Sequence, residues 1–249
     1  MIDLLPPDLS QAHALFLLAV SFATSLMTAA LGIGGGAVFL AVAAVILPPA
    51  ALIPVHGVVQ LGSNAVRATM FRTHILRSAL PAFTIGALIG VAIGGSVAVS
   101  LPPATVQIGI GLFLLWVVLG KTPAWIGKWP IGAGAFSSFL TMFFGATGPF
   151  VAAYVKTMKL DRHTHVATHA ALMTVQHGLK VAMFAALGFG FAPWVLFIAG
   201  LIICGAAGTW VGKHVLGRMS DHGFHKVLNV LLILIALRLL WAGASDFLP

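Results

Sequence analysis

The sequence predicts an all-α polytopic membrane protein built from two inverted repeats of five hydrophobic segments each. Three observations support this fold class. Of the 249 residues, 60% are hydrophobic and only 7% are charged, whereas a water-soluble domain carries about 25% charged residues. The apolar residues lie in long blocks, close to the roughly 20 residues that a helix needs to cross a bilayer. The two halves of the chain also resemble each other in sequence.

The composition excludes several classes of protein. A soluble enzyme would need a wetted surface, and a transmembrane β-barrel would show alternating segments of about ten residues. Cys204 is the only cysteine, so the chain forms neither an intrachain disulfide nor a thiolate metal cluster. The formal net charge is +8, but the cations stand singly between apolar blocks. We therefore expect the lipid bilayer, and no nucleic acid, as a partner, and no cofactor.

Ten apolar segments form two sets of five, separated by Gly, Pro and small basic clusters. They cover approximately residues 13–31, 36–47, 50–71, 78–99 and 104–120, and then 130–144, 149–158, 163–187, 191–212 and 224–243. An acidic stretch precedes the first segment, where a signal peptide needs a basic one, so we expect this segment to be retained. The second and seventh are short for a full crossing. They either cross or form re-entrant hairpins, and we favour hairpins with tips inside the membrane.

A gap-free self-comparison supports the division into halves. Residues 26–71 placed over residues 139–184, at an offset of 113, give nine identities in 46 pairs. These include Gly32 with Gly145, Gly35 with Gly148, His56 with His169, Met70 with Met183 and Phe71 with Phe184, and Arg67 faces Lys180. We expect one integrated domain with repeats at 1–124 and 125–249. Because five is an odd number, the second repeat enters the membrane from the opposite side.

The loop charges predict the orientation. With ten segments, one side collects all the loop cations, which are Arg72, Arg77, Lys121, Lys128, Lys156, Lys159, Arg162, Lys213, Arg218 and Lys226. The other side holds Asp3, Asp8 and Asp246. Cytoplasmic loops carry an excess of Lys and Arg. We therefore expect both termini outside the cytoplasm, and the loops near 72–77, 121–128, 156–162 and 213–226 inside it.

Glycine-rich breaks precede both short segments. They read Gly32-Ile33-Gly34-Gly35-Gly36 in the first half and Gly145-Ala146-Thr147-Gly148-Pro149 in the second. Interrupted segments at matching positions of two halves indicate the midplane site of a transporter. A helix that begins inside the membrane directs unpaired N–H groups and its positive dipole end into a cavity. The simpler alternative is that these glycines only allow close helix packing.

Polar side chains form matching stripes on the third and eighth segments. The third carries His56, Gln60, Ser63, Asn64 and Arg67 on one helical face, and the eighth carries His169, Gln176, His177 and Lys180, with Met173 in place of the first Gln. Polar residues inside spans usually face a cavity, so the stripes predict a water-accessible path. In an inverted repeat, His56 and Lys180 lie toward the outside. Arg67 and His169 then lie toward the cytoplasm.

Simpler explanations exist for the stripes as well. Arg67 lies about one turn from the cytoplasmic boundary, from which it could snorkel. Lys180 lies about two turns from its boundary, which makes snorkelling harder. His56 and His169 could form hydrogen bonds between helices, and the neighbouring small polar residues could serve packing.

The candidate site is suited to an anion. Arg67 and Lys180 supply positive charge, Thr147 adds a hydroxyl, and no Asp or Glu lies in a confident span. A metal ion would find no charged ligand there, and the ten histidines show no recognised metal-binding spacing. The candidate substrate-binding residues are Gly34, Gly35, Gly36, His56, Gln60, Ser63, Asn64, Arg67, Thr147, Gly148, His169, Gln176, His177 and Lys180.

The direction of transport follows from the membrane potential. An inside-negative potential drives a monovalent anion outward by about 2.3 kcal/mol per 100 mV, so export needs no coupling ion. Uptake of the same anion is the alternative. An intramembrane enzyme would need a nucleophile beside His169 or His177, and the sequence shows none. A non-transporting subunit would need a partner, for which the short loops offer little surface.

Two regions resemble a known family. Gly-Ile-Gly-Gly-Gly at 32–36, the turn at Pro48-Pro49 and the stretch from Pro54 to Asn64 resemble the TauE/SafE sulfite exporter family. Gly145-Ala-Thr-Gly-Pro-Phe150 is similar to its second-half counterpart. The resemblance covers about residues 14–243. The commoner pattern has a Pro after the first glycine run and a Thr-Ser pair near His56-Gly57, and this sequence lacks both, which leaves the substrate open.

The resemblance implies a carrier in a bacterial inner membrane for sulfite, sulfonates or related anions. The sequence thus predicts a secondary transporter, not an enzyme, that exports sulfite or a short organosulfonate by alternating access. The anion would bind at the half-helix starts, Gly34–Gly36 and Thr147–Gly148, with Arg67 and Lys180 supplying charge between the repeats. Uptake of sulfur anions, or carriage of another small anion, is the alternative. A homo-oligomer is compatible with the sequence.

Overall fold

A computed structural model shows the fold of residues 5–6, 9–31, 34–98, 102–121, 123–215 and 221–245, and this part of the chain is helical without strands. The α-helices are α1 Gln11–Leu31, α2 Gly35–Ala43, α3 Pro49–Met70, α4 Leu80–Ala98, α5 Pro103–Leu119, α6 Pro130–Phe144, α7 Gly148–Lys156, α8 Arg162–Ala186, α9 Val195–Val215 and α10 Asp221–Ser245. Short 3-10 turns cover Arg72–His74, Arg77–Ala79, Ala124–Gly127 and Ala192–Trp194. The all-α prediction is confirmed for these residues.

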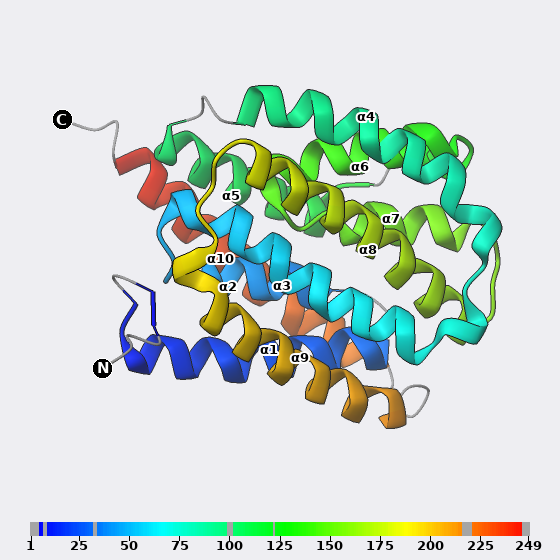
Figure 1. The fold of residues 1–249 in the computed structure, drawn as a ribbon, viewed down its shortest axis with the longest axis horizontal. Coiled ribbons are helices and arrows are strands. Elements are labelled where there is room, and N and C mark those ends of the chain that lie inside the picture. The colour runs from blue at the N-terminus through cyan, green and yellow to red at the C-terminus, as the bar shows by residue number, and fades with distance from the viewer. Residues whose placement is uncertain are drawn as a thin grey trace.

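The helices pack in pairs that join the two halves of the chain (Figure 1). α1 packs along α9, α4 along α6, and α5 along α10, while α3 and α8 lie against each other between them. α9 also contacts α3, and α4 contacts α8. Each helix of the first half has a counterpart five places later, so that α1 corresponds to α6 and α4 to α9. When every helix is replaced by its counterpart, the α1–α9 pair becomes the α6–α4 pair, and the α3–α8 and α5–α10 pairs stay the same. The α3–α8 interface is therefore where the two halves meet at the centre of the bundle.

α2 and α7 are half-helices. Each has nine residues, and at a rise of 1.5 Å per residue this gives about 13 Å. The hydrocarbon core of a bilayer is about 30 Å thick, so neither helix crosses it alone. α2 begins at Gly35 and ends at Ala43, and α7 begins at Gly148 and ends at Lys156. The first residues of α2 and α7 are 113 residues apart, and so are their last residues. This is the offset that the sequence comparison gives.

Both half-helices end earlier than the apolar segments that predict them. The segment 36–47 suggests a longer helix, but α2 ends at Ala43 and a turn follows. Leu47 precedes Pro48, and a residue before proline is disfavoured in the α conformation. α7 also ends before the predicted segment 149–158 does. Here the cause is Lys159, which adopts a left-handed backbone with φ of 52°. Apolar composition alone does not show these stops.

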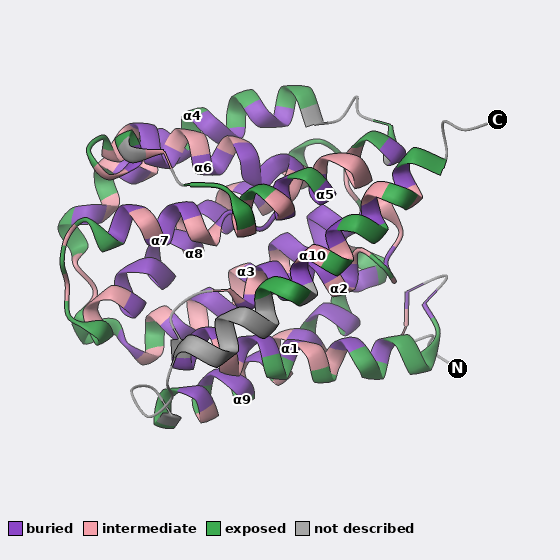
Figure 2. Ribbon diagram, turned by 180° about the vertical axis from the view of Figure 1, so that it is seen from behind, coloured by how far each residue is buried: buried purple, intermediate pink, exposed green. Residues whose placement is uncertain are grey.

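The helices expose one face at the outside of the bundle and bury the other (Figure 2). Three stretches are long and apolar enough to cross a membrane: Gln11–Ala30, Arg77–Val97 and Ala192–His214. Their exposed faces carry large apolar side chains such as Leu15, Ile89 and Ile203, while buried residues face inward. A soluble monomer does not expose apolar surface on this scale. Lipid tails are the environment that suits it, and the fold is that of a multi-pass membrane protein.

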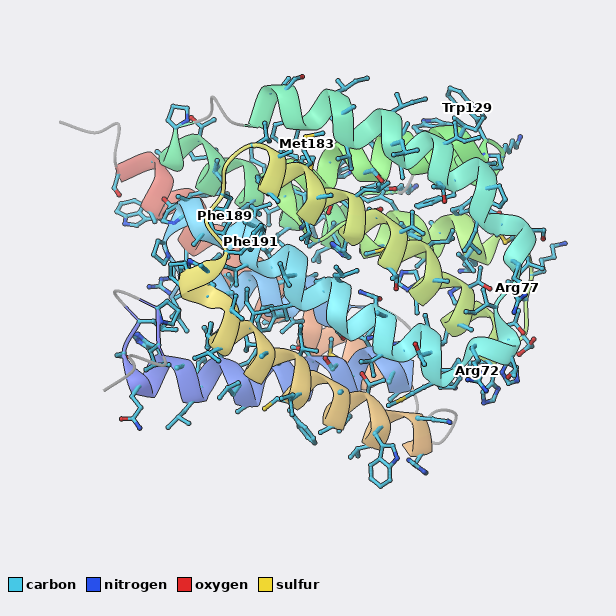
Figure 3. The ribbon with its side chains drawn as sticks, viewed as in Figure 1. Arg72, Arg77, Trp129, Met183, Phe189 and Phe191 are labelled. Carbon is cyan, nitrogen blue, oxygen red and sulfur yellow. The ribbon has the colours of Figure 1, made fainter. Side chains whose placement is uncertain are left out.

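The two ends of the bundle differ in the side chains that they carry. α1 begins and α10 ends at one end (Figure 1), where Phe189 and Phe191 also lie (Figure 3). Arg72, Arg77 and Trp129 lie at the opposite end. This is the separation that the loop-charge prediction requires. The side chains of Asp3, Asp8, Arg218, Lys226 and Asp246 are outside the described part of the structure.

Candidate functional site

The polar stripes of α3 and α8 lie in the interior of the bundle. The α3 residues His56, Gln60, Ser63, Asn64 and Arg67 are each at most 9% exposed, and the α8 residues His169, Gln176, His177 and Lys180 are each at most 3% exposed. Because α3 packs directly against α8, the two stripes meet along one interface. They form a buried polar seam at the centre of the bundle, as the helical spacing predicts.

The glycine breaks place the N-termini of the two half-helices beside this seam. Gly34 caps α2 with φ of 104°, and Gly145 ends α6 with φ of 71°. Glycine adopts such left-handed backbone conformations at little cost, and other residues do not. Gly34 and Thr147 precede α2 and α7, and neither makes a side-chain capping hydrogen bond. The N–H groups at these helix starts therefore receive no side-chain cap.

Two histidines hold the half-helices against α3 and α8. His56 Nε2 donates to the Gly36 carbonyl at 3.1 Å, and His169 Nε2 donates to the Gly148 carbonyl at 3.2 Å. A carbonyl oxygen only accepts, so each bond places a proton on Nε2. The Nδ1 atoms of both rings are buried and have no partner among the described residues. Each half-helix thus has a fixed position and leaves one ring nitrogen available.

Arg67 is buried without an ion-pair partner. Its side chain is 2% exposed. Nη1 donates to Asn64 Oδ1 at 3.0 Å, Nη2 donates to Ser63 Oγ at 3.3 Å, and Nε has no partner in the described part of the chain. Asn64 is oriented for this contact because its Nδ2 donates to the Gln60 carbonyl at 2.8 Å. The guanidinium is therefore positioned by neutral oxygens, with no carboxylate among the described side chains to balance its charge.

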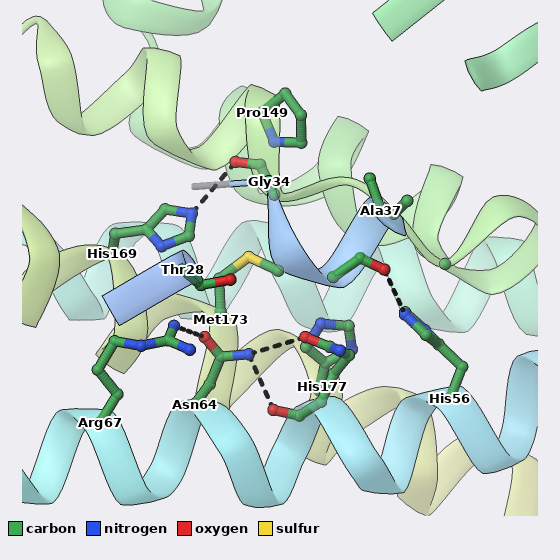
Figure 4. A pocket seen from close by; sticks show the side chains of 15 residues that line it. Thr28, Gly34, Ala37, His56, Asn64, Arg67, Pro149, His169, Met173 and His177 are labelled. Atoms are coloured by element: carbon green, nitrogen blue, oxygen red, sulfur yellow. Dashed lines mark hydrogen bonds between the residues drawn. The ribbon is translucent and has the colours of Figure 1, made fainter. Parts of the chain in front are cut away.

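A small cavity lies between these groups (Figure 4). Its volume is about 30 Å³, which is room for a few atoms since a single water needs roughly 10–15 Å³. Nine of the predicted residues line it: Gly34, Gly36, His56, Gln60, Asn64, Arg67, Gly148, His169 and His177. The view shows Arg67 and Asn64 on one side and the Gly34–Ala37 turn on the other. The starts of both half-helices thus reach the same cavity as the guanidinium.

The other five predicted residues lie around the cavity without lining it. Ser63 shares a hydrogen bond with Ser25 of α1 at 3.1 Å and accepts from Arg67. Gln176 Nε2 donates to Thr147 Oγ1 and so ties α8 to the start of α7. Gly35 packs against Thr24 and Thr28. Lys180 packs against Gly57 of α3, so Arg67 and Lys180 do not line a common cavity.

Six further residues line the cavity: Thr28, Ala37, Gly145, Ala146, Pro149 and Met173. Gly145, Ala146 and Pro149 belong to the second break, and Met173 occupies the repeat position of Gln60. Thr28 was not among the candidates. Its hydroxyl donates to the Thr24 carbonyl, as threonines in ordinary helices do, so its sequence context does not distinguish it. The repeat alignment pairs Thr28 with Thr141, and this identity is the signal in the sequence that could have identified Thr28.

The charge balance of the site favours an anion. Among the side chains that the structure describes, Asp161 is the only carboxylate, and it lies at the start of α8, where Oδ1 accepts from the backbone N–H of His163 and Thr164. The pKa of Asp161 lies below its ordinary value, mainly because its carboxylate accepts a hydrogen bond from the side chain of Thr164 and also because it accepts from the backbone of Thr164 and His163. No group of three or more His, Cys, Asp or Glu side chains suited to a metal occurs in the described part. The cavity offers hydrogen-bond donors and positive charge.

The comparisons with known proteins give one match. A family model described as Sulfite exporter TauE/SafE matches residues 17–239, which is nearly the whole chain. Neither the curated proteins nor the solved structures contain a match to the chain.

Proposed function

The chain belongs to the TauE/SafE family of sulfite exporters, and we propose that it exports a small sulfur-containing anion, either sulfite or a short organosulfonate, across a bacterial inner membrane. It acts as a secondary transporter by alternating access, without enzymatic chemistry. The observation that carries this proposal is Arg67: a guanidinium that is 2% exposed, has no carboxylate partner among the described side chains, and lines a small cavity between the half-helices and α3. A buried unpaired cation is unfavourable unless an anion joins it.

The donors around the cavity match an oxyanion. Arg67 Nε has no partner among the residues that the structure describes, and charge-assisted hydrogen bonds to an anion are stronger than bonds between neutral groups. The starts of α2 and α7 add the positive ends of two helix dipoles. Gly34, Gly36 and Gly148 at these starts have no side chain to keep an anion from the backbone. The substrate therefore binds between the half-helices and α3.

Alternating access in this proposal rests on the inverted repeat. The offset of 113 relates the sequences, the bounds of α2 and α7, and the positions of His56 and His169, whose acceptor carbonyls in the half-helices, Gly36 and Gly148, lie 112 residues apart. The helix pairing is also unchanged by exchange of the two halves. Rocking of one repeat against the other about the α3–α8 interface would open the cavity first to one side and then to the other.

The direction of transport is outward in this account. The end of the bundle with Arg72 and Arg77 faces the cytoplasm by the positive-inside rule, which puts both termini outside. Arg67 lies on the half of α3 nearer that end, one turn before the helix ends at Met70. An anion that enters from the cytoplasm meets this cation first, and the membrane potential favours its exit.

The test is transport by the purified protein in liposomes. We expect saturable, electrogenic flux of sulfite or short sulfonates that continues without a proton gradient. Sulfate and chloride serve as comparison anions in the same vesicles. Absence of flux for every sulfur oxyanion, from protein that remains folded, would contradict the proposed cargo. Flux that requires an inward ion gradient would favour the uptake alternative.

A further inference from the structure

Lys180 is a second buried cation that has no partner in the described part of the chain. It lies on α8, its side chain is 0% exposed, and Nζ has no hydrogen-bond partner among the described residues. It packs against Gly57 of α3, where an added Cβ would lie 3.4 Å from Nζ. An ammonium group with three donors in such a place requires a compensating acceptor or anion. The described carboxylate, Asp161, is at the far end of α8.

Lys180, which is on α8, meets α3 too far from the guanidinium of Arg67 for one small anion to bind both cations. Lys180 lies beside Gly57, whereas the guanidinium of Arg67 is held at the level of Ser63. Six residues separate these two levels, which corresponds to roughly 9 Å along the helix. An oxyanion accepts from donors within about 3 Å of its oxygens. The oxyanion therefore contacts one cation at a time. This agrees with the lining of the cavity, which includes Arg67 and does not include Lys180.

His177 lies between the two cations. It lines the Arg67 cavity and precedes Lys180 by three residues, so both side chains lie on the same face of α8. It is 0% exposed, and neither of its ring nitrogens has a hydrogen-bond partner in the described part of the chain. Its ring centroid is 6.0 Å from that of His56, whose Nδ1 also has no partner among the described residues. These ring nitrogens therefore lie between the cavity that Arg67 lines and Lys180.

We propose that Lys180 forms a second anion position, distinct from the Arg67 cavity, which a small oxyanion reaches by passing His177. This inference rests on the proposed function, in which such an anion crosses the protein. The two positions occupy equivalent places in the two repeats, since Arg67 and Lys180 are separated by the offset of 113. Arg67 receives the anion from the cytoplasmic side, and Lys180 holds it before release on the other side.

The test is binding of radiolabelled sulfite to purified wild-type protein, Arg67→Met, Lys180→Met and the double variant. We expect Arg67→Met to keep saturable binding that the double variant loses, because the remaining binding is at Lys180. Each single variant loses about tenfold or more in flux, the equivalent of one charge-assisted hydrogen bond. Lys128→Met removes an exposed cation in a loop and is the matched control with normal binding and flux.

Two results would overturn the second position. One is a folded Arg67→Met protein that binds no sulfite although the wild type does. The other is an Arg67→Met protein whose sulfite binding is unchanged by adding Lys180→Met. Arg67→Gln keeps a donor for Asn64 and replaces Arg67→Met in the series should the latter fail to fold.

Bromide, located by anomalous diffraction in crystals of the wild type and of Lys180→Met, separates this inference from the proposed function. We expect a bromide ion beside Lys180 Nζ in the wild type and none there in the variant. Bromide at this place without sulfite binding would contradict the proposed cargo and support the second position. Bromide at Arg67 alone would contradict the second position whatever the cargo.

Discussion

His56 and His169 make the same contact in the two halves of the molecule. Each ring Nε2 donates to a backbone carbonyl in the first turn of the nearby half-helix, His56 to Gly36 at 3.1 Å and His169 to Gly148 at 3.2 Å. The two histidines are separated by 113 residues, the offset of the repeat. Each half-helix start is thereby held at the cavity, so that its N–H groups and dipole face the space beside Arg67.

Removal of one histidine anchor should loosen its half-helix. We expect His169→Ala to lower the free energy of unfolding by about 1 kcal/mol, the net value of a typical hydrogen bond, and to reduce sulfite flux. His169→Gln retains an N–H donor and should recover most of the stability. Thermal unfolding in detergent and flux in liposomes measure the two effects. A His169→Ala protein with wild-type stability and flux would show that the contact does not position α7.

Gly145 should tolerate no side chain, for two separate reasons. Its φ of 71° is unfavourable for alanine, and an added Cβ would lie 3.0 Å from His56 Nδ1. We expect Gly145→Ala to be destabilised by about 1–2 kcal/mol and to lose transport. Gly188 has φ of 88° but no atom within 4 Å of an added Cβ. Gly188→Ala should therefore share the destabilisation and keep the flux, and equal flux in both variants would argue against a role for the His56 contact.

Gly57→Ala should separate stability from transport. Alanine is a better helix former than glycine by about 1 kcal/mol, but the added Cβ would lie 2.6 Å from Lys180 Cε and displace that flexible side chain. We expect equal or higher stability and a clear loss of sulfite flux. Gly178→Ala gains the same helix propensity, with an ordinary 3.7 Å contact to Leu61 Cδ1, and should transport normally. Full flux by Gly57→Ala would mean that the position of Lys180 does not matter.

Asp161 should make part of the stability depend on pH. Hydrogen bonds from Thr164 and His163 hold its folded-state pKa below the ordinary value of 3.8. The stabilisation is therefore present above pH 3.8 and is lost as the pH falls through the lower folded-state pKa. Asp161→Asn keeps the capping geometry without titrating, and we expect its unfolding temperature to change less over this range. Parallel pH profiles for both proteins would contradict the assignment.

Much of the architecture follows from local sequence signals. The long apolar blocks predict the helices because a bilayer requires satisfied backbone groups over about 20 residues. The 3.6-residue spacing predicts that His56, Asn64 and Arg67 share one face, and they do line one cavity. The stops of α2 and α7 depend instead on single backbone conformations, such as that of Lys159.

The inverted repeat predicts the relative depth of the two cations, with Lys180 near His56 toward the outside and Arg67 toward the cytoplasm. Spacing along α8 places Lys180 on the polar face but does not show whether it shares a cavity with Arg67. That depends on the packing of α3 against α8, which puts Lys180 beside Gly57 and away from the Arg67 cavity. Thr28 was missed although α1 carries a buried stripe of small hydroxyl side chains, Ser21, Thr24, Ser25 and Thr28. Such residues bond to nearby carbonyls in ordinary helices, and the place of Thr28 at the cavity results from the packing of α1 beside α2.

The central claim is that the cavity at Arg67 carries a sulfur oxyanion across the membrane. The most direct measurement is sulfite flux in liposomes under an imposed potential, for the wild type, Arg67→Met and Lys128→Met. We predict saturable, potential-driven flux for the wild type and for Lys128→Met, and a reduction of about tenfold or more for folded Arg67→Met. Wild-type flux by a folded Arg67→Met protein would contradict the claim.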